Sequence, residues 1–181
     1  LSMFLSQAMS EDRSCQNAVN RHAIGRLSGG LSLTSLHTGG YCRARQRLPL
    51  DMVKGLTTFI GGKMDEKTPS DWLWKSRRVR IVDGTTVTMP DTPENQSVYP
   101  QQGAQKPGLG FPICRIVGIT SLENGSLINA AVGRFQGKGG DEQTLLRSLC
   151  DTFDCNDIVL ADAFFTTYFF IAQMQARGVD L

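Results

Sequence analysis

Two strand-like segments joined by an Asn-Gly turn constrain the fold of this chain most strongly. Residues 113–122 and 126–135 are rich in apolar and β-branched residues, and Glu123-Asn124-Gly125 stands between them. Asn-Gly is a strong hairpin signal because a tight two-residue turn needs residues that tolerate positive φ. We therefore expect two antiparallel strands here.

The elements around this hairpin predict an α/β fold. Val79–Val82 is strand-like and leads into Asp83-Gly84, after which Thr85–Met89 continues as a return strand. Downstream, the pattern predicts a helix over Asp141–Phe153, a short buried strand over Ile158–Ala161, and a helix from Thr166 or Thr167 to Arg177 that Gly178 terminates. The start of a further strand follows at Val179. Three antiparallel strands followed by helix-connected strands is the order of an incomplete ribonuclease H-like core.

The N-terminal segment is predicted to be a small all-α region. Ser10 is the expected N-cap of a first helix that Gly29-Gly30 ends. Thr38 is expected to cap a second helix that stops before Pro49, and Leu50–Ile60 is expected to form a third, closed by Gly61-Gly62. These features predict two parts, a helical segment over residues 1–66 and the α/β core over residues 67–181.

Charge is distributed unevenly along the chain. Residues 1–64 carry eight basic and three acidic side chains, whereas residues 65–181 carry eleven basic and fourteen acidic ones. Such a balance fits a polyanion-binding module attached to a carboxylate-bearing body, and a solvated basic face is the alternative. Arg43, Arg45 and Arg47 recur at every second residue. We favour a DNA-backbone contact for them over simple solvation.

A proline-rich segment separates the first strand from the hairpin. Five of the seven prolines lie between Pro90 and Pro112. This much proline predicts an irregular but ordered loop, because proline restricts the unfolded chain as well. Loops of this length within a compact domain are usually functional.

Two acidic residues are the main candidates for chemistry. Asp83 follows the strand at Val79–Val82, and Asp162 follows the strand at Ile158–Ala161. In the expected fold these strands are neighbours at the centre of the sheet, so the two carboxylates would lie side by side. Close carboxylates repel each other unless one is protonated or a cation lies between them, and oxygen ligands suit Mg²⁺ or Mn²⁺. A turn-forming role is the alternative for each aspartate.

A family resemblance extends this interpretation. The segments that carry it are Phe4–Gln7, Asp12–Cys15, Tyr41–Pro49, Val82–Thr92, Asn95-Gln96, Tyr99–Gln101, Gln105–Pro112, Gly137–Gly139 with Glu142, Leu145, Leu146 and Arg147, Leu160–Asp162, Tyr168, and Arg177–Asp180. In this order they resemble the insertion-sequence transposases of the IS-four family, which are DDE-type enzymes. One departure is Ala163, because the family usually has Arg directly after its second Asp.

The resemblance implies a DNA transposase that cleaves the ends of an insertion sequence and joins them to target DNA. Asp83 and Asp162 would be catalytic and would hold two Mg²⁺ or Mn²⁺ ions. The family's third ligand, a Glu, lies downstream of the region matched, so we expect the chain to be a portion that ends before it. The implied partners are transposon-end and target DNA, with a homodimer in the DNA complex, in the bacterial cytoplasm and nucleoid. The alternatives are a truncated remnant that only binds DNA and a ribonuclease H-like nuclease.

Several other residues have both a functional and a less specific interpretation. Lys106 and Lys138 lie in loops and are candidate phosphate contacts. The glycines around Lys138 lack the spacing of a nucleotide-binding loop. Glu142 could assist the metal site, but a first-turn acid that favours the helix dipole is the preferred interpretation. The five cysteines have neither zinc-site spacing nor an even count, so we expect free, buried or half-buried thiols. No apolar run is long enough for a membrane span.

Overall fold

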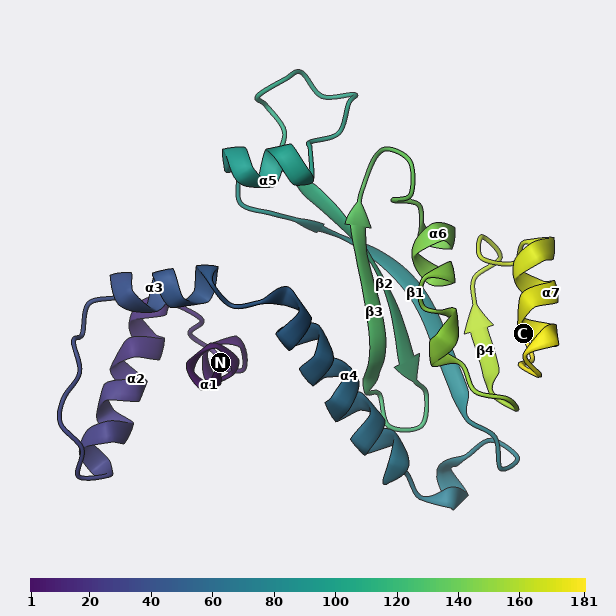
Figure 1. Ribbon diagram of the computed structural model, residues 1–181, viewed down its shortest axis with the longest axis horizontal. Coiled ribbons are helices and arrows are strands. Elements are labelled where there is room, and N and C mark those ends of the chain that lie inside the picture. Colours follow the sequence, from purple (N-terminus) through teal and green to yellow (C-terminus); the bar gives the residue numbers. More distant parts are fainter. The chain divides into compact units, whose positions relative to one another are not determined.

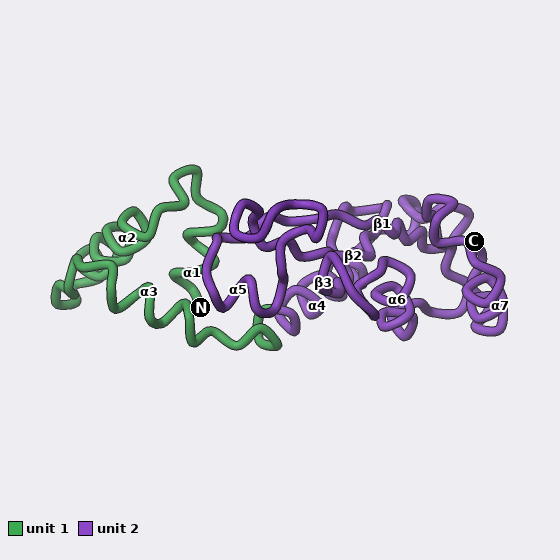
Figure 2. The backbone as a smooth tube through the Cα atoms, turned by 90° about the horizontal axis from the view of Figure 1, so that it is seen from above, with its two compact units in different colours: residues 1–53 green, residues 54–181 purple.

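The computed structural model describes residues 1–181 as a mixed α/β protein (Figure 1). The chain forms two compact units, Leu1–Val53 and Lys54–Leu181 (Figure 2). The boundary between them falls inside helix α4 (Leu50–Glu66). No helix is both long enough and apolar enough to cross a membrane.

The first unit is helical, as expected, with α1 (Ser2–Ala8), α2 (Cys15–Ser28) and α3 (Gly39–Gln46). The predicted N-cap at Ser10 is wrong. The hydroxyl of Ser14 accepts a hydrogen bond from the backbone N–H of Asn17 at 3.1 Å, so α2 begins at Cys15. The predicted end of α2 at Gly29 and the start of α3 at Thr38 are confirmed.

The second unit is built on a four-stranded mixed sheet in the order β3-β2-β1-β4. The predicted hairpin is confirmed as β2 (Ile113–Ser121) and β3 (Leu127–Arg134). Strand β1 (Val79–Thr88) pairs antiparallel with β2 and parallel with β4 (Ile158–Ala161), so the first and fourth strands are neighbours, as expected. The expected position of both at the sheet centre is wrong for β4, which is the last strand of the order. The predicted strand after Gly178 is limited to a single bridge between Ile158 and Asp180.

Strand β1 corrects the prediction at its centre. The segments on either side of Asp83-Gly84 form one continuous strand rather than a strand and its return. Asp83 and Gly84 pair with Gly118 and Val117 of β2, so the strand continues through them. Asp83 is therefore at the end of the pairing with β4, not at the end of β1.

Four helices accompany the sheet, and three of them differ from the prediction. Helix α4 continues through Gly61-Gly62 to Glu66, and α5 (Pro93–Val98) interrupts the proline-rich segment that was expected to be irregular. Helix α6 (Glu142–Arg147) is shorter than predicted and is followed by a 3-10 turn, η2 (Cys150–Thr152). Helix α7 (Tyr168–Ala176) begins after its N-cap Thr167 and ends before Gly178, as expected. A second 3-10 turn, η1 (Ser70–Trp72), precedes β1.

The hydrophobic core of the second unit lies between the sheet and helices α6 and α7. It includes Val117 and Ile119 from β2, Leu146 from α6 and Met174 from α7, each at most 1% exposed. Figure 1 shows α7 next to β4, whereas α6 packs against β2 and β3.

Helix α4 is attached to the sheet by a close approach and by ion pairs. A Cβ at Gly61 would lie 3.0 Å from the Cα of Ile128 and closer still to the carbonyl oxygen of Leu127, so only glycine allows the helix this near to β3. Four residues later, Asp65 accepts two hydrogen bonds from the guanidinium of Arg80 on β1, at 2.8 and 2.7 Å. Gly61 is thus a packing glycine rather than the helix stop that its sequence context predicts.

Candidate functional site

Asp83 and Asp162 occupy neighbouring positions on two adjacent strands. The parallel register of β1 and β4 ends with the pair Val82 and Ala161, and the two aspartates are the next residue on each side. Adjacent strands lie about 4.8 Å apart, so residues at this step of a parallel pair are close neighbours. The sheet therefore brings together two carboxylate-bearing residues that are 79 positions apart in the sequence.

Each of these carboxylates is oriented by one backbone hydrogen bond. Oδ1 of Asp83 accepts from the N–H of Gly84 at 2.8 Å, and Oδ1 of Asp162 accepts from the N–H of Phe164 at 2.9 Å. Both residues are exposed, and neither forms an ion pair. Carboxylate oxygens thus remain available at both positions for an external cation.

Glu142 packs directly over the glycine that follows Asp83. A Cβ at Gly84 would lie 2.7 Å from the carboxyl carbon of Glu142 and 2.8 Å from its Oε1. The same Oε1 is 3.5 Å from Nε of Arg115, whose Nη1 donates to the carbonyl oxygen of Gly140 at 3.1 Å. Arg115 also lies over the ring of Phe135, with 4.9 Å between the guanidinium carbon and the ring centroid. Glu142 is therefore an ion-paired residue beside the site, and not merely the first-turn acid of a helix.

The donor set fits a hard divalent cation, although two carboxylates make an incomplete cage. Oxygen ligands without a competing basic partner are what Mg²⁺ and Mn²⁺ bind. No group of three or more His, Cys, Asp or Glu side chains is arranged to hold a metal ion. Asp83 and Asp162 are neighbouring carboxylates that suit such an ion, and Glu142, ion-paired with Arg115, lies beside them.

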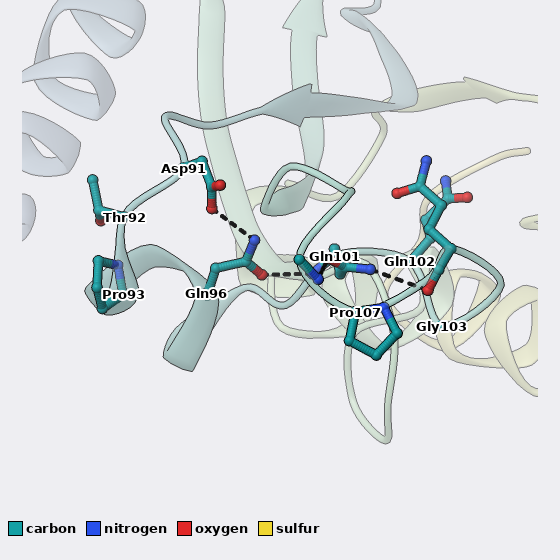
Figure 3. Close-up of a pocket in the computed structure, with 10 residues that line it drawn as sticks. Asp91, Thr92, Pro93, Gln96, Gln101, Gln102, Gly103 and Pro107 are labelled. Atoms are coloured by element: carbon teal, nitrogen blue, oxygen red, sulfur yellow. Dashed lines mark hydrogen bonds between the residues drawn. The ribbon is translucent and has the colours of Figure 1, made fainter.

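The loop after β1 is held together by glutamine side chains. Gln96 donates to Oδ1 of Asp91 at 2.8 Å and accepts from the backbone N–H of Gln101 at 3.0 Å (Figure 3). The amide oxygen of Gln101 accepts from the N–H groups of Gly108 and Gly110, both at 3.1 Å. These contacts surround an open pocket of about 630 Å³ and give an otherwise irregular segment a defined shape.

The five basic residues predicted to contact DNA are all exposed. Arg43, Arg45 and Arg47 are on or next to α3 in the first unit, whereas Lys106 lies in the proline-rich loop and Lys138 in the loop after β3. None of them forms an ion pair with a carboxylate. Arg45 differs from the others because its Nη1 lies 3.3 Å from the sulfur of Cys15.

These features define a mixed α/β domain with a pair of carboxylates directly after the last paired residues of β1 and β4. Comparison with protein families agrees, because the model of the transposase DDE domain matches residues 74–181, more than half of the chain. The protein therefore belongs to the transposase DDE domain family. No curated protein and no solved structure matches the chain.

Family membership gives the site a general context. Proteins of this family act on DNA in transposition, with chemistry of the nucleotidyl-transferase type, and DDE transposases generally use divalent metals. The matched region includes β1 to β4 and both aspartates. It also includes Glu142 and Arg115, whose contact depends on tertiary packing, and the loop held together by Gln96 and Gln101.

Proposed function

We propose that this protein is an insertion-sequence transposase of the IS-four type, in which a ribonuclease H-like core cleaves transposon ends and transfers the strand to target DNA. The observation that carries the proposal is the parallel pairing of β1 with β4, which makes Asp83 and Asp162 neighbours. The family match over residues 74–181 supports the same assignment.

Asp83 and Asp162 are the proposed catalytic carboxylates and metal ligands. Each is held by one backbone N–H through Oδ1, and each is exposed to approaching ligands. Two bound Mg²⁺ or Mn²⁺ ions would activate the attacking oxygen and stabilise the leaving oxygen of a phosphodiester displacement. We assign only these two carboxylates to the site.

The residues around this pair would support the site rather than take part in the reaction. Gly84 has no side chain, and the space beside it is occupied by the carboxylate of Glu142. Because Glu142 is bound to Arg115, we assign it to holding the segment around Asp83 in place rather than to binding a metal ion directly. Ala163 directly follows Asp162, so a phosphate contact from that position would have to come from another residue.

DNA binding is assigned to the exposed basic residues. We propose that the helical segment 1–66 contacts DNA through Arg43 and Arg47, with Arg45 as a less available member of the same helix because it contacts Cys15. Lys106 and Lys138, each in a loop of the 67–181 core, are proposed to contact phosphates. Such contacts would be recognised by a steep loss of affinity with rising salt. A homodimer in the DNA complex is part of the same proposal.

The proposal is tested with the protein expressed from its complete reading frame and with DNA carrying the ends of the insertion sequence that encodes it. We expect Mg²⁺-dependent cleavage and strand-transfer products. Asp83→Asn or Asp162→Asn should remove both products and leave DNA binding unchanged. Asp151→Asn is the matched control, because Asp151 is an exposed aspartate of the same unit, paired only with Arg177. Cleavage that persists in either site variant would contradict the assignment, and cleavage without strand transfer would favour a nuclease.

A further inference from the structure

Three helices of the first unit place polar side chains around the sulfur of Cys15. Cys15 is the first residue of α2, Gln7 comes from α1, and Arg45 comes from α3. Nη1 of Arg45 lies 3.3 Å from the Cys15 sulfur, and Nε2 of Gln7 lies 3.7 Å from it. A positive charge and an amide donor thus point at one thiol, an arrangement that stabilises a thiolate.

The donors around Cys15 are themselves held in place. Gln7 is only 7% exposed, and its Oε1 accepts a hydrogen bond from the hydroxyl of Tyr41 at 2.5 Å. The guanidinium of Arg45 lies 5.8 Å from the ring centroid of Phe4 and 6.0 Å from that of Tyr41. These contacts hold both donors in their orientation toward the Cys15 sulfur.

A second thiol, Cys42, completes the cluster. Cys42 precedes Arg45 by three residues on α3, so its side chain lies on the helix face whose Arg45 contacts Cys15. Both cysteines are half-buried, so small reagents can reach them. Partial burial raises the pKa of Cys15, but hydrogen bonds from Cys42, Arg45 and Gln7 and the charge of Arg45 outweigh it and bring the pKa below its ordinary value. The hydrogen bond to Cys15 raises the pKa of Cys42, as partial burial also does. Cys15 is thus the expected nucleophile, and Cys42 is its neutral partner.

We propose that Cys15 and Cys42 form a redox-reactive dithiol that peroxides or low-molecular-weight disulfides convert to a disulfide joining α2 to α3. With a disulfide such as oxidised glutathione, the Cys15 thiolate attacks one sulfur and releases one glutathione thiolate. Cys42 then loses its proton and attacks the mixed disulfide, which forms the Cys15–Cys42 bond and releases the second glutathione. The protein loses two electrons, and the glutathione disulfide gains them.

The other three cysteines lack this environment. Cys114 and Cys150 are buried, and burial raises the pKa of Cys150. Cys155 is exposed, and its sulfur occupies the space where a Cβ at Gly178 would stand, with no hydrogen bond from a basic side chain. Cys155 is therefore the internal control for a thiol that is accessible but not activated.

The test needs no variant in its first step. The folded, reduced chain is treated briefly with iodoacetamide at neutral pH, and modification of each cysteine is measured by peptide mass spectrometry. A second sample is treated with oxidised glutathione and searched for the linked Cys15–Cys42 peptides. We expect alkylation of Cys15 to be about tenfold faster than that of Cys155, and the linked peptides to form. Equal alkylation rates, or glutathione addition without the link, would overturn the proposal.

Variants then separate the roles of the two thiols and of Arg45. Cys42→Ser should trap glutathione on Cys15, because the resolving thiol is missing. Arg45→Gln should slow alkylation of Cys15, whereas Arg43→Gln, on the same helix without a contact to Cys15, should not. The proposal fails if Arg45→Gln leaves the rate unchanged in a variant whose helical circular dichroism equals that of the parent. The dithiol does not depend on transposase activity, so its test stands apart from the DNA-cleavage test.

Discussion

The buried guanidinium of Arg80 offers the sharpest test of how the second unit is held together. Its side chain is 3% exposed and donates two hydrogen bonds to Asp65 of α4, at 2.8 and 2.7 Å. Its Nε lies 3.3 Å from Oδ2 of Asp157, which precedes β4 and has a side chain only 4% exposed. One cation on β1 thus neutralises two carboxylates from elements far apart in the sequence.

We predict that Arg80→Met destabilises the protein by about 3 kcal/mol. Methionine keeps much of the aliphatic volume but leaves buried carboxylates, and breaking a buried pair in this way costs about 3–5 kcal/mol. The lower end applies because Arg78, whose side chain is 33% exposed, is also paired with Asp65 and remains. Asp157 keeps only the backbone N–H of Asp154, at 3.1 Å.

The loss should depend on pH. Burial raises the pKa of Asp65, but the hydrogen bond and charge of Arg80 and the charge of Arg78 outweigh it, so the pKa lies below its ordinary value. A lowered pKa gives stability that is present above the unfolded value, about 4, and is lost as pH falls through the folded value. Burial raises the pKa of Asp157 even with Arg80 present. Without Arg80, acid protonates both buried carboxylates and removes their unpaired charge. The difference in the free energy of unfolding between variant and parent should therefore shrink as pH falls toward about 4.

Urea unfolding followed by tryptophan fluorescence measures this effect. Both tryptophans, Trp72 and Trp74, lie in the second unit and therefore report its unfolding. The control is Lys63→Met, which removes a pair with Glu66 whose side chains are 50% and 64% exposed, and it should change stability by less than about 0.5 kcal/mol. A loss below about 1 kcal/mol for Arg80→Met at pH 7, or a loss that is constant with pH, would refute the reasoning.

Three further substitutions test two close contacts and one helix cap of the second unit. Gly61→Ala should destabilise the protein by at least about 1–3 kcal/mol, measured by urea unfolding, because the new methyl group meets the backbone at Leu127; an unchanged midpoint would contradict the close approach. Gly84→Ala should displace Glu142 and weaken Mn²⁺ binding measured by electron paramagnetic resonance, and unaltered affinity would show that Glu142 does not support the site. Asp141→Ala should cost about 1 kcal/mol through loss of the N-cap of α6, and this difference should fade in acid because the pKa of Asp141 is lowered by hydrogen bonds within the first helical turn; a difference that persists in acid would argue against the cap.

Local signals predicted the parts of the fold that depend on local chemistry. The Asn124-Gly125 turn predicted the β2–β3 hairpin, and Thr167 with Gly178 predicted both ends of α7. In each case a short-range turn or cap determines the backbone conformation. Gly178 adopts φ +72°, which glycine reaches without strain.

The sequence misled where a residue serves a distant contact. Gly61-Gly62 predicts a helix stop, but the helix continues because Gly61 admits the backbone of β3. Asp83-Gly84 was interpreted as the end of a strand, but pairing with Gly118 and Val117 of β2 carries β1 onward. Neither neighbour is visible in the sequence around the residue concerned.

The same distinction between local signals and long-range contacts applies to the candidate site. Its two aspartates could be predicted, because each follows an apolar strand segment and the element order makes those strands neighbours. The packing of Glu142 on Gly84 and its pairing with Arg115 could not, because they depend on how α6 lies against the sheet. The contact between Arg45 and Cys15, 30 positions apart, was likewise invisible to the charge pattern.

The central claim, that Asp83 and Asp162 form one divalent-metal site, is tested most directly by locating the metal. Fe²⁺ in place of Mg²⁺, with ascorbate and peroxide, cleaves the backbone near the bound ion, and mass spectrometry identifies the cut positions. We predict cuts near residues 83 and 162 that excess Mg²⁺ suppresses, that Asp83→Asn or Asp162→Asn abolishes, and that Asp151→Asn leaves unchanged. Cuts elsewhere, or cuts at these positions that survive both site substitutions, would contradict the account.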